Sequence, residues 1–365
     1  MPLRTPLCDL LGIELPIIQA GMGVWGMATP PKLVAAVSNA GGLGVLGCSG
    51  LSPEEMRRRI RETRRLTDKP FGVDLLLPAS LAPAATTRSG VREDLRRNHP
   101  EHVAFYESLL ERFGLSETPV QDDIVISDTF VESQIAVTLE EKVPVFAAGL
   151  GDPARVAPRA REQGMVLMGL SGSPRNAQRQ VRSGVDIVVS QGTEGGGHTG
   201  RIANFALIPQ TVDAIAPVPV VAAGGISDGR GIVAALALGA VGAWIGTLFL
   251  TAAESDMPDL CKDELVSGIA TDFDITRSWT GKTLRAYRNP VSQAWAESGL
   301  DPLPTPHQRV LMEDFLEAVK ATGRWELFMN AAGQGAGGIT KRRSAGEIVR
   351  DLAREAEEVL ERLRG

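Results

Sequence analysis

The chain has 365 residues and a formal net charge of −6, with 43% hydrophobic and 22% charged residues. This composition is typical of a globular protein with one large domain or two ordinary ones, and the negative charge argues against a nucleic acid or an anionic membrane as the main partner. No apolar run reaches about 18 residues and the N-terminus lacks the apolar core of a signal peptide, so we expect a cytoplasmic protein without a membrane span.

Cysteine and histidine are sparse and show no metal-binding pattern. Cys8, Cys48 and Cys261 are too widely spaced for a disulfide framework or a metal site. The four histidines form no HxH or HExxH motif, and the chain has no CxxC pair. The sequence therefore predicts no dedicated metal site.

Short apolar runs alternate with helix-like segments over most of the chain. The predicted strands span residues 15–20, 43–46, 71–77, 143–147, 165–170, 185–189, 219–223 and 241–245. The run at 185–189 is rich in β-branched residues, as a strand buried on both faces is. The predicted helices between these strands span residues 31–39, 53–65, 130–141, 153–163, 174–182, 207–215 and 229–238.

Eight such strands in sequence predict an α/β fold of the (β/α)8, or TIM-barrel, type. The competing topology is an open doubly wound sheet, which normally carries GxGxxG after its first strand. Gly21, Gly23 and Gly26 satisfy that spacing. We give this motif little weight because no helix follows it directly and no acidic residue ends the second predicted strand.

The predicted helix at 53–65 is strongly basic, and Ser52 is its expected N-cap because Ser-Pro-Glu-Glu forms a capping box. A basic cluster can indicate an anion site, but glutamates stand among these arginines. We therefore expect a solvated helix face. The arginines are Arg57, Arg58, Arg59, Arg61, Arg64 and Arg65, and the glutamates are Glu54, Glu55 and Glu62.

The alternation breaks between about residues 78 and 129, where a polar stretch is long enough to be an insertion after strand 3 with helices of its own. Beyond residue 255 the chain is irregular before helices predicted at 305–321 and 344–363. We expect a barrel at 1–255, which includes the insertion, and a C-terminal helical appendage at 256–365 that packs on the barrel as a lid.

The insertion and the segment 285–338 are expected to wall a pocket, while the insertion's His99 and His102 are expected at the surface. Aromatic residues could shape this pocket or simply pack the appendages. They are Phe105, Tyr106, Trp279, Tyr287, Trp295 and Trp325.

Functional residues of such barrels lie at the C-terminal ends of the strands. The glycines after strands seven and eight are informative, because backbone N–H groups there, aided by a helix N-terminus, form the usual phosphate site of the fold. This favours a mononucleotide cofactor such as FMN. Asp74 lies within an apolar strand, where a carboxylate needs a partner. The candidates are Ala20, Gly21, Met22, Asp74, Gln191, Gly196, Gly197, His198, Gly224, Gly225, Gly246 and Thr247.

Residues 16–255 resemble the nitronate monooxygenase family, formerly called 2-nitropropane dioxygenases. The segments that carry the resemblance are PIIQAGMG, AVSNAGGLGVLG, KPFGVDLL, VSQGTEGGGHTG, PVVAAGGISDGRG and WIGTLFLTAAES, and they occur in this order. The broader family also holds FMN-dependent enoyl reductases and NADH:quinone reductases. Membership implies a barrel that binds FMN.

The resemblance also implies individual roles. His198 would be the catalytic acid or base. The FMN contacts would come from Asp74, Gln191, Gly196, Gly225, Trp244, Ile245, Gly246 and Thr247.

Three residues depart from patterns of the family. Many members have Asn at the position of Asp74 and Gln at the position of Trp244. The quinone-reductase branch has His at the position of Asn176, so Asn176 argues against that branch.

The leading functional hypothesis is FMN-dependent oxidation of an alkyl nitronate or nitroalkane with O2. His198 would move a proton near the reacting carbon, and an unperturbed imidazole pKa of about 6.5 suits that work. The alternative is an FMN-dependent NAD(P)H enoyl or quinone reductase with His198 as proton donor. A third reading is a non-catalytic barrel that senses a phosphorylated metabolite. If the protein is an enzyme, its expected partners are the small-molecule substrate and O2. A homodimer is the assembly considered for the chain.

Overall fold

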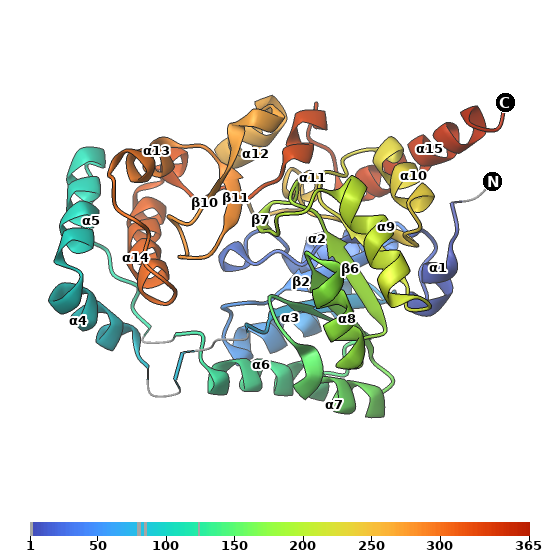
Figure 1. Cartoon of the computed structure of the whole chain (residues 1–365), viewed down its shortest axis with the longest axis horizontal. Coiled ribbons are helices and arrows are strands. Elements are labelled where there is room, and N and C mark those ends of the chain that lie inside the picture. The colour runs from blue at the N-terminus through green and yellow to red at the C-terminus, as the bar shows by residue number, and fades with distance from the viewer. Residues whose placement is uncertain (1–2, 79–81, 84–85, 123–124) are drawn as a thin grey trace.

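Eight parallel strands close into a barrel (Figure 1). The computed structural model describes residues 3–78, 82–83, 86–122 and 125–365, and the barrel order is β1-β2-β3-β4-β5-β6-β8-β9. Pairing of β1 with β9 closes the sheet, so the predicted TIM barrel is confirmed and the open sheet is wrong. The strands are Ile17–Gln19 (β1), Leu43–Gly47 (β2), Phe71–Leu76 (β3), Val145–Gly149 (β4), Val166–Ser171 (β5), Ile187–Gln191 (β6), Val220–Ala223 (β8) and Gly242–Ile245 (β9).

Helices follow the strands and cover the outside of the barrel. They are α2 (Pro31–Asn39), α3 (Pro53–Leu66), α6 (Asp128–Glu140), α7 (Ala157–Glu162), α8 (Pro174–Arg182), α9 (Asn204–Ile215), α10 (Gly229–Ala237) and α11 (Thr247–Leu250). The helix predicted at 153–163 is instead a 3-10 turn at Pro153–Arg155 followed by α7, because Pro158 lacks the N–H that a continuous helix would use. No helix among the described residues is both long and apolar enough to cross a membrane.

A short helix that the sequence analysis missed, α1 (Pro6–Leu11), covers the N-terminal end of the barrel. Its Leu7 and Leu11 are buried in the same apolar cluster as barrel-strand residues such as Val145. Leu7 approaches β9 so closely that a Cβ at Gly242 would lie 2.4 Å from its Cδ2. The apolar side chains of α1 therefore close the N-terminal end of the barrel.

The insertion after β3 and part of the C-terminal region pack together beside the barrel, on the left of Figure 1. Two arginines of α4 form ion pairs with α14. An Arg88 guanidinium nitrogen lies 2.7 Å from Glu313 Oε2, and one of Arg92 lies 2.7 Å from Asp314 Oδ1. The helices of this group are α4 (Arg88–Asn98), α5 (Pro100–Phe113), α13 (Pro290–Glu297) and α14 (His307–Thr322). The helix α12 (Asp259–Ser267) precedes α13 in the chain.

A second, three-stranded sheet lies between this group and the barrel (Figure 1). It consists of β10 (Phe273–Thr276), β11 (Leu284–Tyr287) and the two-residue β7 (Gly197–His198). The sequence analysis expected irregular structure after residue 255, and this is wrong for the β10–β11 hairpin. The pattern was hard to detect because β11 pairs on one side with a fragment of a glycine-rich loop almost ninety positions earlier.

The last helix, α15 (Ala345–Arg362), returns to the barrel and packs against α10 and α2. Its Ile348, Val349 and Leu352 are buried. The C-terminal region therefore contributes both to the group beside the barrel and to the barrel's outer layer. The division of the chain at residue 255 stays a prediction.

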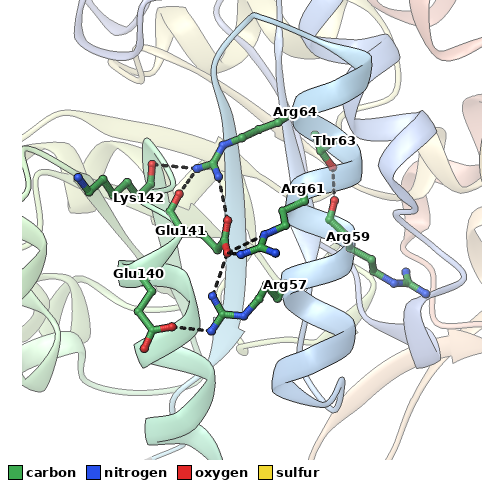
Figure 2. A network of polar contacts seen from close by, with 8 residues as sticks. All are labelled: Arg57, Arg59, Arg61, Thr63, Arg64, Glu140, Glu141 and Lys142. Atoms are coloured by element: carbon green, nitrogen blue, oxygen red, sulfur yellow. Dashed lines mark hydrogen bonds and ion pairs between the residues drawn. The ribbon is translucent and has the colours of Figure 1, made fainter.

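The basic face of α3 is not simply solvated. Arg57, Arg61 and Arg64 converge on the carboxylate of Glu141, which follows α6 and is 7% exposed (Figure 2). Their nitrogens lie 2.9–3.0 Å from its oxygens. These charge-assisted contacts fix α3 against α6. Arg61 and Arg64 are nevertheless exposed, so the face is solvated as expected and also holds Glu141.

We predict that Glu141→Gln lowers the free energy of unfolding by about 2 kcal/mol near neutral pH, because a buried carboxylate that accepts several charged hydrogen bonds is lost. The matched control is Glu140→Gln, whose exposed carboxylate contacts only Arg57 among the described residues. Urea unfolding should show the larger loss in Glu141→Gln, and equal losses in the two variants would contradict this.

Candidate active site

A cavity of about 2000 Å³ lies at the C-terminal ends of the barrel strands, as the fold predicts. It brings together all the residues proposed from the sequence, although their roles toward a ligand stay predictions. These lining residues are Ala20, Gly21, Met22, Asp74, Gln191, Gly196, Gly197, His198, Gly224, Gly225, Trp244, Ile245, Gly246 and Thr247.

The turns after β8 and β9 offer backbone donors to this cavity. Ala223 pairs with Trp244, so Gly225 and Gly246 follow their strands at the same edge of the barrel. None of the described residues accepts a hydrogen bond from the N–H of Gly225 or Gly246. Gly225 has a φ of 73°, which glycine adopts without steric cost. Two free N–H groups at adjacent turns can bind an anion such as a phosphate.

The helix after β8 does not add its N-terminus to this anion site. Asp228 caps α10 by accepting a hydrogen bond from the N–H of Gly231 at 3.1 Å. The N–H of Gly229 donates to Glu355 Oε2, also at 3.1 Å. Because these N–H groups are already used, the expected support from a helix N-terminus is wrong for α10.

The loop between β6 and β7 is held by side chains at both of its ends. Gln191 donates from Nε2 to the carbonyl of His198 at 2.8 Å. The carboxylate of Glu194 accepts from the N–H of Asn204 at 2.9 Å, at the start of α9. Asn204 in turn donates to the carbonyl of Gly224. These contacts tie the glycine-rich loop to the turn after β8.

The C-terminal segment presses on the same loop. A Cβ at Gly196 would lie 2.5 Å from the carbonyl carbon of Ala332, and a Cβ at Gly333 would lie 2.5 Å from the carbonyl oxygen of Glu194. Glycine is therefore required at 196 for close approach of two backbones. The resemblance to the family had implied that Gly196 contacts the cofactor, and it gave no sign of this packing against the C-terminal segment.

Asp74 reaches the cavity as a buried and unpaired carboxyl group. It lies in β3 and is 5% exposed, and a Cβ at Gly21 would lie 2.3 Å from its own Cβ. No described residue forms a hydrogen bond or ion pair with its carboxyl group, so the expected partner of Asp74 is not one of these residues. Burial raises the pKa of Asp74 well above its ordinary value. A neutral carboxyl group can donate a hydrogen bond, as the Asn of many family members can.

His198 lies in β7 opposite Leu284 of β11. Its Nδ1 is 3.2 Å from the carbonyl of Thr283, and because a carbonyl can only accept, Nδ1 carries the proton and Nε2 keeps its lone pair. Burial, with help from the nearby charges of Lys282 and Arg309, lowers the pKa of His198 to about 4. The expectation of an unperturbed pKa is therefore wrong, and the ring is a neutral base at neutral pH.

Lys282 is a candidate functional residue that the sequence analysis missed. It lines the cavity beside Thr283, and burial lowers its pKa. Within the part of the chain that the structure describes, no carboxylate pairs with its ammonium group. Arg309 also lines the cavity, but it forms an ion pair with Glu313 at 2.7 Å. Lys282 was missed because only the β7–β11 pairing brings it near the glycine-rich loop.

The two expected walls do line the cavity, through residues of 78–129 such as Thr87 and Val120 and of 285–338 such as Val310 and Met329. Of the aromatic residues considered, Trp279 lines it. The others pack within the appendages, as the T-shaped contact of Phe105 with Trp295, ring centroids 4.8 Å apart, shows. These others are Phe105, Tyr106, Tyr287, Trp295 and Trp325.

Comparisons with known proteins show the family to which the chain belongs. The family model for nitronate monooxygenase matches residues 4–355. A Staphylococcus aureus protein named "Probable nitronate monooxygenase" is 32% identical, over 91% of each chain. The crystal structure of nitroalkane oxidase from Streptomyces ansochromogenes superposes with a TM-score of 0.83 at 31% identity, covering 98% of this chain and 99% of that one. FabK from Thermotoga maritima superposes with a TM-score of 0.78 at 31% identity, covering 99% of both chains.

We predict that Asp74→Asn stabilises the flavin-free protein increasingly as pH rises from 5 to 8. Folding raises the pKa of Asp74. Its contribution to the free energy of unfolding is therefore fully present below the ordinary pKa and is lost as the pH rises through the pKa of the folded state. The loss is at most about 1.4 kcal/mol per pH unit, and Asn does not titrate. Urea unfolding at several pH values measures the difference. Asp213→Asn, at an exposed site on α9, is the control, and a pH-independent effect of Asp74→Asn would contradict the neutral carboxyl group.

Proposed function

We propose, since the chain belongs to the nitronate monooxygenase family, that this oxidoreductase uses FMN to oxidise alkyl nitronates and nitroalkanes with O2. The observation that carries the proposal is a neutral imidazole base, His198, in a cavity with the unpaired ammonium of Lys282. A base next to a cation suits a carbon acid that becomes an anion when it loses its proton. Membership of an enzyme family sets aside the non-catalytic sensor.

The cavity residues suit a flavin with one phosphate. The unpaired N–H groups of Gly225 and Gly246 supply donors for that phosphate. Burial raises the pKa of Asp74, and its carboxyl group supplies a further hydrogen-bond donor when it is protonated. FMN would supply the redox chemistry, because it accepts electrons from the substrate and passes them to O2. The protein's part is binding, orientation and proton transfer.

His198 moves the proton in this proposal. Its Nε2 takes the proton from the carbon that bears the nitro group, while Nδ1–H stays on the Thr283 carbonyl and fixes the ring. Negative charge then moves onto the nitro oxygens, where the positive charges of Lys282 and Arg309 stabilise it. A substrate supplied as the nitronate has already lost the proton and needs only the cations.

An NAD(P)H-dependent enoyl or quinone reductase is the second candidate, and the likeness to FabK favours it. That reaction requires a proton donor, whereas the low pKa of His198 leaves its ring uncharged at neutral pH. Asn176 also lines the cavity, where the quinone-reductase branch carries His. Anaerobic mixing separates the two: we expect 2-nitropropane and its nitronate to bleach the flavin, and rapid bleaching by NADPH alone would favour the reductase.

We predict that heat releases FMN, and not FAD, from the purified protein, and that Gly225→Val empties the site. Valine is strained at a φ of 73°, and its Cβ would lie 3.2 Å from Glu194 Cβ, so the turn that presents the N–H group is displaced. Flavin absorbance measures occupancy. Gly299→Val is the matched control, because Gly299 has a φ of 75° with no atom near its Cβ position. Recovery of FAD, or full occupancy in folded Gly225→Val, would contradict the phosphate site.

We predict that His198→Asn keeps the fold and the flavin but slows flavin reduction by neutral 2-nitropropane by about 10²–10⁴-fold, the usual contribution of a placed acid or base. Reduction by the preformed nitronate should fall much less, because no proton has to be removed. Anaerobic stopped-flow absorbance compares the two substrates. An unchanged rate with 2-nitropropane would exclude His198 as the base.

A further inference from the structure

Three of the four histidines of the chain gather outside the barrel, where α4, α5 and α14 lie together (Figure 1). His99 joins α4 to α5, and His307 is the first residue of α14. Asp94, on α4, faces both. One ligand atom from each of Asp94, His99 and His307 lies within 4.8 Å of the other two. The mechanism proposed above uses none of these groups.

The side chains of this cluster have free coordination capacity. Oδ2 of Asp94 lies 2.9 Å from Nε2 of His307. Oδ1 of Asp94 accepts hydrogen bonds from Nδ2 of Asn98 at 2.7 Å and from a guanidinium nitrogen of Arg97 at 3.3 Å, and these contacts orient the carboxylate as outer partners of metal ligands do. Neither ring nitrogen of His99 has a hydrogen-bond partner among the described residues.

The scaffold under the cluster is rigid without a ligand. The ion pairs of Arg88 with Glu313 and of Arg92 with Asp314 join α4 to α14. Both carboxylates are about 10% exposed, so these contacts are screened little by solvent. The helices that carry Asp94 and His307 are therefore held together by other residues, which favours a preformed site.

A neighbouring set shares His99 and adds Glu101 and His102. His102 is buried, so the expectation of a surface position is wrong for it, and its Nε2 is already 3.0 Å from the carbonyl of Asp301. Its Nδ1 lies 3.2 Å from Glu101. His102 thus has a structural partner at each nitrogen, whereas Asp94, His99 and His307 are all half-exposed.

We propose that Asp94, His99 and His307 bind one divalent transition-metal ion such as Zn²⁺. Two imidazoles and one carboxylate are the donor set that such ions prefer over Mg²⁺ or Ca²⁺. Tetrahedral zinc places its ligand atoms about 3.3 Å apart, so small side-chain rotations close the site, and water completes the coordination. The sequence analysis expected no metal site because these residues come from separate segments.

The bound ion joins the insertion to the C-terminal region. Asp94 and His307 also line the large cavity, so the metal stabilises its outer wall. Its role is structural, and it does not depend on the redox chemistry proposed for the barrel.

The test uses the full-length chain without a polyhistidine tag, freed of metals with a chelator. Titration with Co²⁺ or Zn²⁺ at pH 7.5 should show one ion per chain with a Kd in the micromolar range or tighter. Bound Co²⁺ should give visible d–d bands without thiolate charge transfer, because the described cysteines are all buried away from the site. Zn²⁺ should also raise the melting temperature.

His307→Gln, His99→Gln and Asp94→Asn should each weaken binding at least tenfold, while His102→Gln and His198→Asn should not. Circular dichroism checks folding, and Asp94→Asn preserves side-chain shape if a histidine variant unfolds. Absence of binding by the wild-type protein at millimolar metal would overturn the proposal. Binding that is lost in His102→Gln but kept in His307→Gln would overturn the assigned ligand set.

Discussion

Desolvation at the C-terminal ends of the barrel strands is the constraint on which the site depends. Ionised groups in this cavity lose hydration, and none of the described residues replaces it for the carboxyl group of Asp74 or the ammonium group of Lys282. Burial raises the pKa of Asp74 and lowers those of His198 and Lys282. The same physical effect therefore gives a neutral acid that can donate a hydrogen bond, a neutral base and a cation that lacks a counterion. An anionic substrate would provide the counterion that the Lys282 ammonium group lacks.

The site is assembled from three distant parts of the chain. The barrel supplies the glycine turns and Asp74, and the loop after β6 supplies His198. The C-terminal region supplies Lys282 and Thr283, and the β7–β11 pairing sets His198 between these contributions. Gly196 and Gly333 permit the close backbone approach that makes this assembly possible. A barrel without its C-terminal region would therefore leave His198 without the carbonyl that fixes its tautomer.

The sequence predicts the elements that are set by the local pattern of apolar and polar residues. The eight barrel strands and most of their helices follow from apolar runs of the right length, and the strand ends then place Gln191 and Gly225 at one cavity. The strand ends also placed His198 at this cavity and favoured FMN, and the resemblance to a known family added the role of His198 as acid or base. Sequence could not reveal the charge state of His198, because its pKa depends on burial by a segment more than eighty residues away. For the same reason Lys282, the Glu141 contacts and the histidine cluster were missed, since each joins elements far apart in the chain.

The pH dependence of kcat/KM for a neutral nitroalkane tests the central claim most directly, in wild type and in Lys282→Met. We predict an acidic limb near pH 4 in the wild-type enzyme, because the half-buried His198 stays a base down to its lowered pKa. In Lys282→Met the limb should move to higher pH, because a nearby positive charge that opposes protonation is gone. A limb near the ordinary histidine value of about 6.5 in both proteins would contradict a desolvated base beside an unpaired cation.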